Sequence, residues 1–119
     1  MIKEKNQFSK LENARKELLR LIFDDGELIE GSYCEILVKC GRAGCHCEKK
    51  PCHLVARLSI REDGKIKNKV VRVADRENVK RLIERFQEHK QALQELERIN
   101  EMEREILKVL IKQKNKGYG

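Results

Sequence analysis

The sequence predicts an α+β fold with an N-terminal helix, a three-stranded antiparallel meander and a long C-terminal helix. Apolar residues recur every three or four positions near both ends of the chain, apolar and polar residues alternate between them, and an Asp-Gly pair separates two alternating runs. The 119 residues suffice for one domain, 1–119. We expect it to contain a helix at 8–23, a β-meander with a metal loop at 33–73, and a helix at 75–113.

The first helix is predicted by an apolar stripe within residues 8–23. Its members follow at helical steps: Leu11, Ala14, Leu18, Leu19 and Ile22. Ser9 is placed to cap this helix, with Glu12 three residues later as its capping-box partner. The sequence Asp-Asp-Gly at 24–26 is expected to end it.

Three alternating runs, 33–40, 54–61 and 66–73, predict the strands, with a hairpin turn at 62–65. The second strand has an apolar face of four residues: Leu54, Ala56, Leu58 and Ile60. The apolar face of the first strand is expected to contain four more: Cys34, Ile36, Val38 and Cys40. One face of the sheet needs a covering helix. We therefore expect Cys34 to be a small core residue and not a metal ligand.

The long helix is predicted by an apolar series that starts after Asp75, a possible N-cap, and runs without Gly or Pro to about residue 113. Such a helix would be roughly 55–60 Å long, which exceeds the width of a small sheet. Its C-terminal part therefore needs another partner. A second copy of the chain, giving a coiled-coil-like homodimer, and the 8–23 helix are the two alternatives, and His89 and Asn100 interrupt a strict heptad.

The charge balance favours a polyanionic partner. Lys and Arg number 27 against 20 Asp and Glu, a formal charge of +7. Basic proteins of this kind bind DNA or RNA, although a solvated basic surface is the simpler alternative. The residues expected to contact phosphates are Lys39, Arg42, Lys49, Lys50, Arg57, Arg61, Lys65, Lys67, Lys69 and Arg72.

The cysteines indicate a metal site. The N-terminal region lacks the apolar core of a secretory leader and no apolar run is long enough to cross a membrane, so we expect a cytoplasmic protein with reduced thiols. Within 40–53, "CGRAGCHCEKKPCH", the spacing predicts a structural Zn²⁺. Its expected ligands are Cys40, Cys45, Cys47 and Cys52, with His53 as the alternative fourth ligand. A redox thiol and an iron–sulfur cluster are the competing interpretations.

The stretch "GSYCEILVKCGRAGCHC" at 31–47 resembles a family of small prokaryotic proteins. That family shows a C-G-K-x-x-C-x-C loop, then a hairpin and a long charged helix, and its genes often lie near transposases. The matching residues are Gly31, Ser32, Glu35, Lys39, Cys40, Gly41, Cys45 and Cys47. Arg42 stands where the family has Lys, and "CHLVAR" at 52–57 replaces a tyrosine-rich strand. The resemblance implies an association with mobile elements.

Together these features predict a zinc-stabilised nucleic-acid-binding accessory protein. The alternative is a protein-interaction or oligomerisation module in which the long helix is the interface and zinc is purely structural. An enzyme is the least favoured class, because the sequence has no phosphate loop and no nucleophile motif, and a zinc with four protein ligands has no open position for water.

Overall fold

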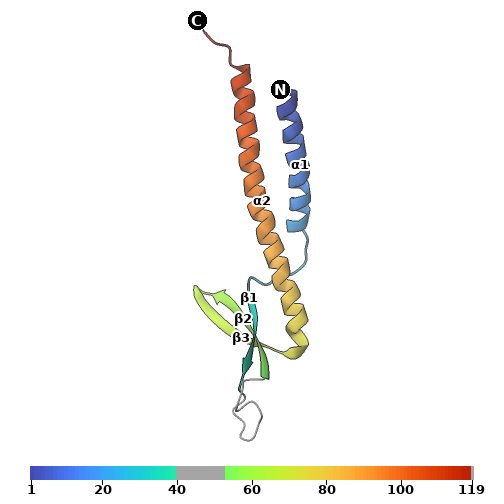
Figure 1. Cartoon of the computed structure of the whole chain (residues 1–119), viewed down its shortest axis with the longest axis vertical. Helices are drawn as coiled ribbons and strands as arrows, with labels where there is room; N and C mark the ends of the chain where they lie inside the picture. The colour runs from blue at the N-terminus through green and yellow to red at the C-terminus, as the bar shows by residue number, and fades with distance from the viewer. Residues whose placement is uncertain (40–52, 119) are drawn as a thin grey trace. The chain divides into compact units, whose positions relative to one another are not determined.

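The computed structural model describes residues 1–39 and 53–118 and confirms the predicted α+β architecture (Figure 1). The elements in chain order are α1 (Ile2–Ile22), β1 (Gly31–Val38), β2 (His53–Glu62), β3 (Lys65–Val71), a 3-10 turn (Val73–Asp75) and α2 (Arg76–Lys114). None of the described helices is long and apolar enough to cross a membrane.

The chain forms two compact units, and the continuous helix α2 contributes to both. One unit, the helical hairpin, comprises Met1–Gly26 and Glu88–Gly119, and the other, the sheet unit, comprises Glu27–Gln87. The prediction of one domain over 1–119 stays a prediction.

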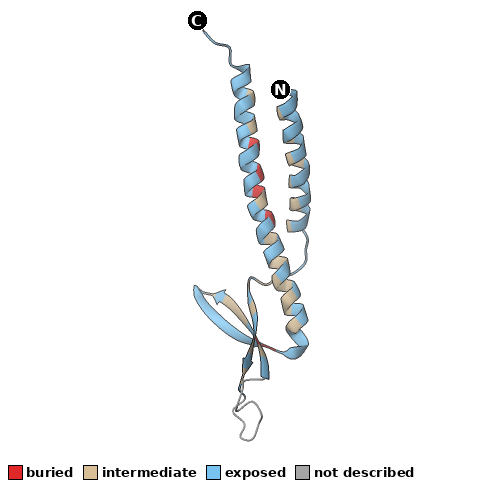
Figure 2. Ribbon diagram, viewed as in Figure 1, coloured by how far each residue is buried: buried red, intermediate tan, exposed pale blue. Residues whose placement is uncertain are grey.

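In the helical hairpin, α1 lies antiparallel to the C-terminal part of α2 (Figure 2). The side chains of α2 that face α1 alternate at steps of four and three, as in a coiled coil. They are Ala92, Leu96, Ile99, Glu103, Ile106 and Leu110. Half-buried positions on α1 follow the same steps: Glu4, Phe8, Leu11, Arg15, Leu18 and Ile22. We call these two series the seam of the hairpin. Two partners were expected for the C-terminal part of the long helix, a second copy of the chain or the first helix. The structure shows the first helix, α1, in contact with it.

Helix α1 begins earlier than predicted. It starts at Ile2 and not at residue 8, so Ser9 lies inside the helix and the expectation that Ser9 caps it is wrong. The additional turn is held by α2, because the Gln113 side-chain amide donates to the Glu4 carboxylate at 3.1 Å. The capping pattern at Ser9 is therefore overridden by packing along the whole length of α1.

The sheet is an antiparallel meander with the strand order β1-β2-β3. The turn between β2 and β3 is the predicted Asp-Gly pair, and both of its residues have positive φ, 51° at Asp63 and 76° at Gly64. Such a two-residue turn matches the twist of the flanking strands. Continuous register across all three strands then fixes which side chains share a face.

The N-terminal part of α2 covers one face of the sheet, which we call the inner face. Lys80 lies 3.1 Å from the Glu35 carboxylate and 5.3 Å from the centre of the Tyr33 ring. Ala56 on β2 is fully buried, and its neighbour Val71 on β3 is nearly so. The predicted inward face of β2 is confirmed.

The prediction for β1 is wrong for Cys34, whereas Ile36 and Val38 on the same face are half-buried and Cys40 lies outside the described residues. The residues beneath the helix are Tyr33 and Glu35, whereas Cys34 lies on the opposite face and is exposed. Because successive side chains of a strand alternate, placing Tyr33 under α2 necessarily turns Cys34 away from it. Cys34 is therefore not a core residue.

Candidate nucleic-acid interface

Most of the predicted metal site lies outside the described residues. Cys40, Cys45, Cys47 and Cys52 all fall there, as do the basic residues Arg42, Lys49 and Lys50. His53, the alternative fourth ligand, is described and is the first residue of β2. It pairs in register with Val38, the last residue of β1, so the chain segment between them leaves and re-enters the sheet on adjacent strands.

No metal-binding group of three or more His, Cys, Asp or Glu side chains is found within residues 1–39 and 53–118. The ligand set predicted from the sequence therefore stays a prediction. Val38 and His53 flank the segment that would hold the metal, and the structure shows these two residues paired with each other.

The sheet has a second face, which α2 does not cover and which we call the outer face. Strand alternation and register assign to it Ser32, Cys34, Ile36, Val38, His53, Val55, Arg57, Ser59, Arg61, Ile66, Asn68 and Val70. Arg72 continues this face, because its backbone is extended, with φ −63° and ψ 146°. The outer face thus contains three arginines and no aspartate or glutamate among the described residues.

The three arginines of the outer face are available to a ligand. Arg57, Arg61 and Arg72 are all exposed. None of the three has an ion pair with any other residue that the structure describes. The guanidinium group matches the geometry of a phosphate with two parallel hydrogen bonds.

The outer face is apolar between its arginines. Val70, beside Arg57 in the register, is 73% exposed, and Ile66, beside Arg61, is 68% exposed. The Ser59 hydroxyl lies 2.6 Å from the Asn68 side-chain oxygen across the same strands. Among the described residues assigned to this face none is aromatic, and Tyr33 lies on the inner face. The surface therefore offers cations and flat apolar area but no platform for stacking bases.

The lysines of the hairpin lie on the other side of the sheet. Lys65, Lys67 and Lys69 follow the inner face, in register with Ile60, Leu58 and their neighbours. Glu62 accepts from Lys67 at 3.0 Å and from Lys69 at 3.4 Å. These two ammonium groups hold the pKa of Glu62 below its usual value, which indicates that their charge is already partly compensated.

The ten basic residues predicted to form one surface are therefore divided. Three of them lie outside the described residues, three arginines lie on the outer face, and three lysines lie on the inner face. Lys39 directly follows β1 and is exposed. This division could have been predicted from the sequence. Once the turn at Asp63 sets the register, strand alternation places Arg57, Arg61 and Arg72 on the face opposite to the lysines.

Comparison with models of known protein families, with curated proteins and with solved structures found no match to this chain.

Proposed function

We propose that the protein is a zinc-stabilised nucleic-acid-binding accessory protein that contacts phosphates through the outer face of its sheet. The observation that carries the proposal is the segregation of charge between the two faces. Exposed arginines, with no carboxylate among the described residues, occupy the outer face, whereas on the inner face Lys67 and Lys69 pair with Glu62, and Glu35 pairs with Lys80 of α2. A net charge of +7 adds long-range attraction for a polyanion.

The proposed contacts are with the backbone of DNA or RNA and not with base edges. Arginine–phosphate contacts position a protein on nucleic acid and supply affinity with little sequence information. None of the described residues on the outer face is aromatic, which argues against recognition by base stacking there. The resemblance to a family encoded near transposases supports an accessory role in the handling of mobile elements.

Zinc is proposed as the structural element of the segment that joins β1 to β2. Cys40, Cys45 and Cys47 would hold it, with Cys52 or His53 as the fourth ligand. The pairing of Val38 with His53 supports this assignment, because it keeps the two ends of that segment together. Metal analysis of the purified protein tests it: we expect one Zn²⁺ per chain, lost on substitution of Cys45 by Ser. A fully metal-free native protein would refute it.

A salt titration of binding tests the outer face. Each phosphate contact contributes a slope of about −0.9 to log K against log salt on duplex DNA. If all three arginines bind phosphates, raising salt from 50 to 200 mM weakens binding about 40-fold by that relation. The double variant Arg57→Ala/Arg61→Ala keeps one contact and should lose only about 3- to 4-fold over the same range. Fluorescence anisotropy with labelled duplex and single strands measures both slopes.

The matched control is Lys67→Ala/Lys69→Ala, which removes the same charge from the same hairpin but from the inner face. We expect this control to retain most of the affinity and slope of the wild type. Equal losses in the two double variants would mean that net charge, and not the outer face, determines binding. Absence of binding at low salt would refute the proposed function altogether.

A second candidate function is self-association through the helical hairpin. The observation that favours it is the exposure of large apolar side chains on α2 within that unit, among them Met102, Leu107 and Val109. Two packed helices form a single layer, so both sides of their seam face solvent unless another layer covers them. Sedimentation of the full-length chain tests this function, and a monomer at all accessible concentrations would refute it.

A further inference from the structure

The positive charge of the helical hairpin is concentrated at the end where α1 begins and α2 ends (Figure 1). Two contacts between the helices, Arg15 with Glu103 and Glu4 with Gln113, fix which residues lie at one level. The first ten residues of the chain therefore lie level with residues 108–116, and we call these two stretches the tip of the hairpin. The tip contains one glutamate, Glu4, and seven lysines: Lys3, Lys5, Lys10, Lys108, Lys112, Lys114 and Lys116.

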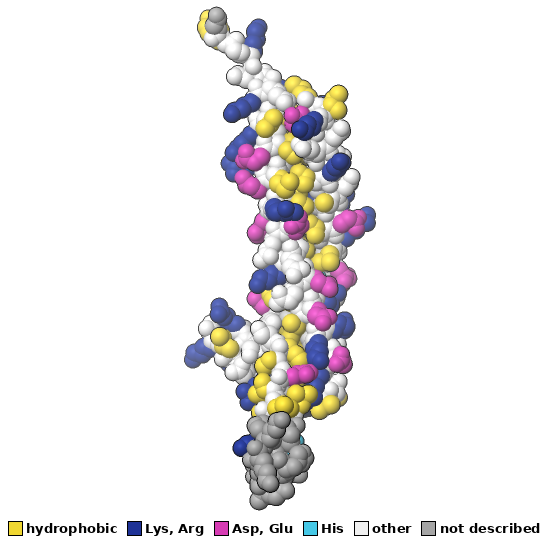
Figure 3. Space-filling view, in the orientation of Figure 1, with side chains coloured by type: hydrophobic (Ala, Val, Ile, Leu, Met, Phe, Trp, Pro, Cys, Tyr) yellow, Lys and Arg dark blue, Asp and Glu magenta, His cyan; other side chains and the backbone are white. Residues whose placement is uncertain are grey.

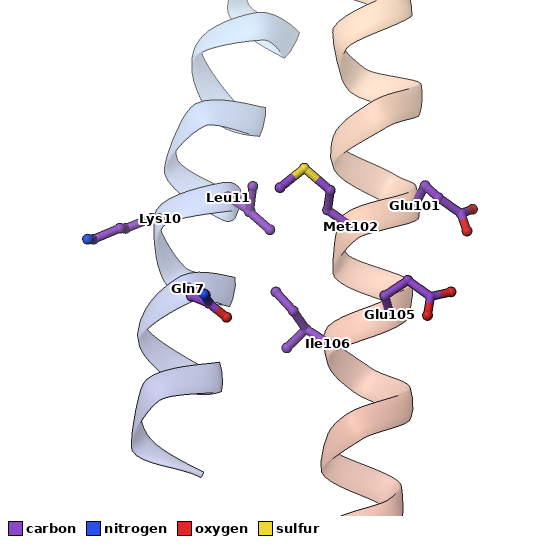
Figure 4. Close-up of a pocket in the computed structure, with 7 residues that line it drawn as sticks. All are labelled: Gln7, Lys10, Leu11, Glu101, Met102, Glu105 and Ile106. Atoms are coloured by element: carbon purple, nitrogen blue, oxygen red, sulfur yellow. The ribbon is translucent and has the colours of Figure 1, made fainter.

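The rest of the hairpin has the opposite net charge. Residues 11–26 and 88–107 contain six Lys and Arg against ten Asp and Glu. Figure 4 shows where the two parts meet: Lys10 on α1 and Glu101 and Glu105 on α2 point away from the apolar side chains between the helices. Three of the six cations outside the tip are paired with glutamates, Arg15 with Glu103, Arg20 with Glu17 and Arg98 with Glu95.

The lysines of the tip are mostly without such partners. Lys108 lies 3.2 Å from Glu105. The other six are exposed, and none of them has an ion pair with any other residue that the structure describes. Like charges four residues apart on a helix, as at Lys108 and Lys112, are destabilising. The stability of the hairpin therefore does not account for this cluster of cations.

The lysines lie around the tip and not on one face of it. Lys10 and Lys5 line two separate hollows, one on each side of the seam. In the space-filling view, dark blue side chains project on both sides of the hairpin near this end (Figure 3). The start of one helix lies beside the end of another here, so the two helix dipoles offset each other. The lysine side chains then determine the local field.

Nucleic-acid phosphates are the ligand that these cations fit. A duplex carries one charge per 1.7 Å of its axis, so the roughly 20 Å width of two packed helices faces about 12 phosphate charges. Lysine binds phosphate as a point charge. The acidic remainder of the hairpin confines the contact to the tip, because a duplex lying along the helices would meet its carboxylates.

A lipid surface fits the tip less well. A helix that lies in a membrane interface buries a large apolar face among the acyl chains. Helix α1 instead packs its apolar residues Phe8 and Leu11, both half-buried, along the seam. Ile2 and Ile111 are nevertheless 78% and 69% exposed, so anionic vesicles are the necessary comparison.

We propose that the tip binds the phosphate backbone of a second nucleic-acid segment, so that one chain bridges two segments. The site at the tip stands on its own observations, whereas the bridging rests on the proposed binding through the outer face. The tip is expected to be the weaker site. Lysine lacks the two-bond geometry of arginine, and the acidic part of the hairpin adjoins the tip within a Debye length of about 10 Å. Titration with duplex should therefore show two steps, and the slopes expected for the outer face apply to the first.

A capture assay with the full-length chain tests the inference. Protein is loaded on a bead-bound duplex, free protein is removed, and a fluorescent duplex is titrated. We expect Lys5→Glu/Lys112→Glu to raise the concentration for half-maximal capture at least tenfold, with the first binding step and the helicity by circular dichroism unchanged. If both lysines contact phosphates, capture by this variant should be about 12-fold less sensitive to raising salt from 50 to 200 mM.

The matched control is Lys16→Glu/Lys90→Glu, which makes the same change of charge at two exposed lysines of the hairpin outside the tip. It should capture the second duplex within about twofold of the wild type. Equal losses in the two variants would overturn the tip as a site, because net charge alone would then explain capture.

The remaining outcomes separate the tip from the outer face. A wild type that binds one duplex and captures no second one would overturn the inference while the outer face stands. Capture that survives Lys5→Glu/Lys112→Glu would mean that associated chains join the duplexes, which also overturns it. Binding that is lost in this variant and unaffected by Arg57→Ala/Arg61→Ala would support the tip and overturn the outer face, and with it the bridging. Flotation with phosphatidylserine vesicles without duplex capture would identify a lipid surface instead.

Discussion

The seam of the helical hairpin contains a charged pair, and we expect replacement of its two members to change stability by different amounts. Arg15 and Glu103 occupy seam positions where the series is otherwise mainly apolar, with 3.4 Å between the guanidinium nitrogen and the carboxylate oxygen. Glu103 is only 5% exposed, whereas the Arg15 side chain retains 39% exposure. Burial raises the pKa of Glu103, the nearby Glu12 carboxyl raises it further, and Arg15 opposes both.

Arg15→Leu is expected to destabilise the hairpin. It leaves a buried carboxylate without its cation, a loss that amounts to about 3–5 kcal/mol for fully buried pairs. Because Arg15 is more than one-third exposed, solvent already screens part of this interaction, and we expect about 1–3 kcal/mol. Guanidinium denaturation followed by circular dichroism at 222 nm measures the free energy of unfolding.

Glu103→Leu should behave differently, because the arginine left behind can turn its charged end into water. We expect it to be within about 1 kcal/mol of the wild type, and Arg15→Leu/Glu103→Leu to be neutral or more stable by about 1–4 kcal/mol. The four proteins form a double-mutant cycle that isolates the coupling. If Glu103→Leu proved more destabilising than Arg15→Leu, the buried carboxylate would not be the unfavourable member of the pair.

The pH dependence has a definite sign. With a folded-state pKa above 4.5, Glu103 binds more protons in the folded chain than in the unfolded chain, so its contribution to stability falls as pH rises from 4.5 through that folded value. Removal of Arg15 should make this decrease in stability with rising pH larger. The deficit of Arg15→Leu is therefore expected to be large at pH 7 and to shrink toward pH 4.5, and a deficit that grows on acidification would contradict the raised pKa.

Three further outcomes follow from the sheet unit. Ala56→Leu places extra methyl groups at a fully buried position and should cost about 1–3 kcal/mol, measured by thermal denaturation; an unchanged melting temperature would mean that the site has space. Gly64→Val forces a branched residue to φ 76° and should cost roughly 1–2 kcal/mol, whereas a stable variant would show that the turn relaxes. Lys80→Ala removes a donor that, after Tyr33, lowers the pKa of Glu35, so this pKa should rise toward 4.5 in a carboxyl NMR titration, and part of the stability contributed above pH 4.5 should be lost.

The elements of the fold could be predicted because their local signals agree. Helical spacing, strand alternation and the Asp63-Gly64 turn each specify one structure, and packing does not override them. The face of β1 could not be predicted, because apolar residues lie on both sides of it. The choice between them depends on Lys80, which is far away in sequence and pairs with Glu35 and Tyr33.

The seam of the hairpin was predicted less well than the helices that form it. Leu93 and Met102 stand at helical steps in the sequence and suggest seam positions, but they are 54% and 44% exposed. The buried series instead includes Ala92 and Glu103. Neither a small residue such as Ala92 nor a charged residue such as Glu103 stands out in a hydrophobic pattern. Only the regular steps of four and three, continued through Glu103, would have marked the two as buried positions. The opposite charge of Arg15 at the matching position of α1 was the remaining clue.

The pairing of Val38 with His53 has a consequence for the entropy of any ligand bound by the segment between them. Fourteen residues separate the two positions, and closing a flexible loop of this length costs roughly 2 kcal/mol beyond the constant term. The eight register pairs of β1 and β2 already meet that requirement when the sheet folds. A Zn²⁺ held by the cysteines would therefore have to order only the interior of the segment. A chelator would then remove the ion, and the ion would rebind, at rates that do not depend on folding of the sheet.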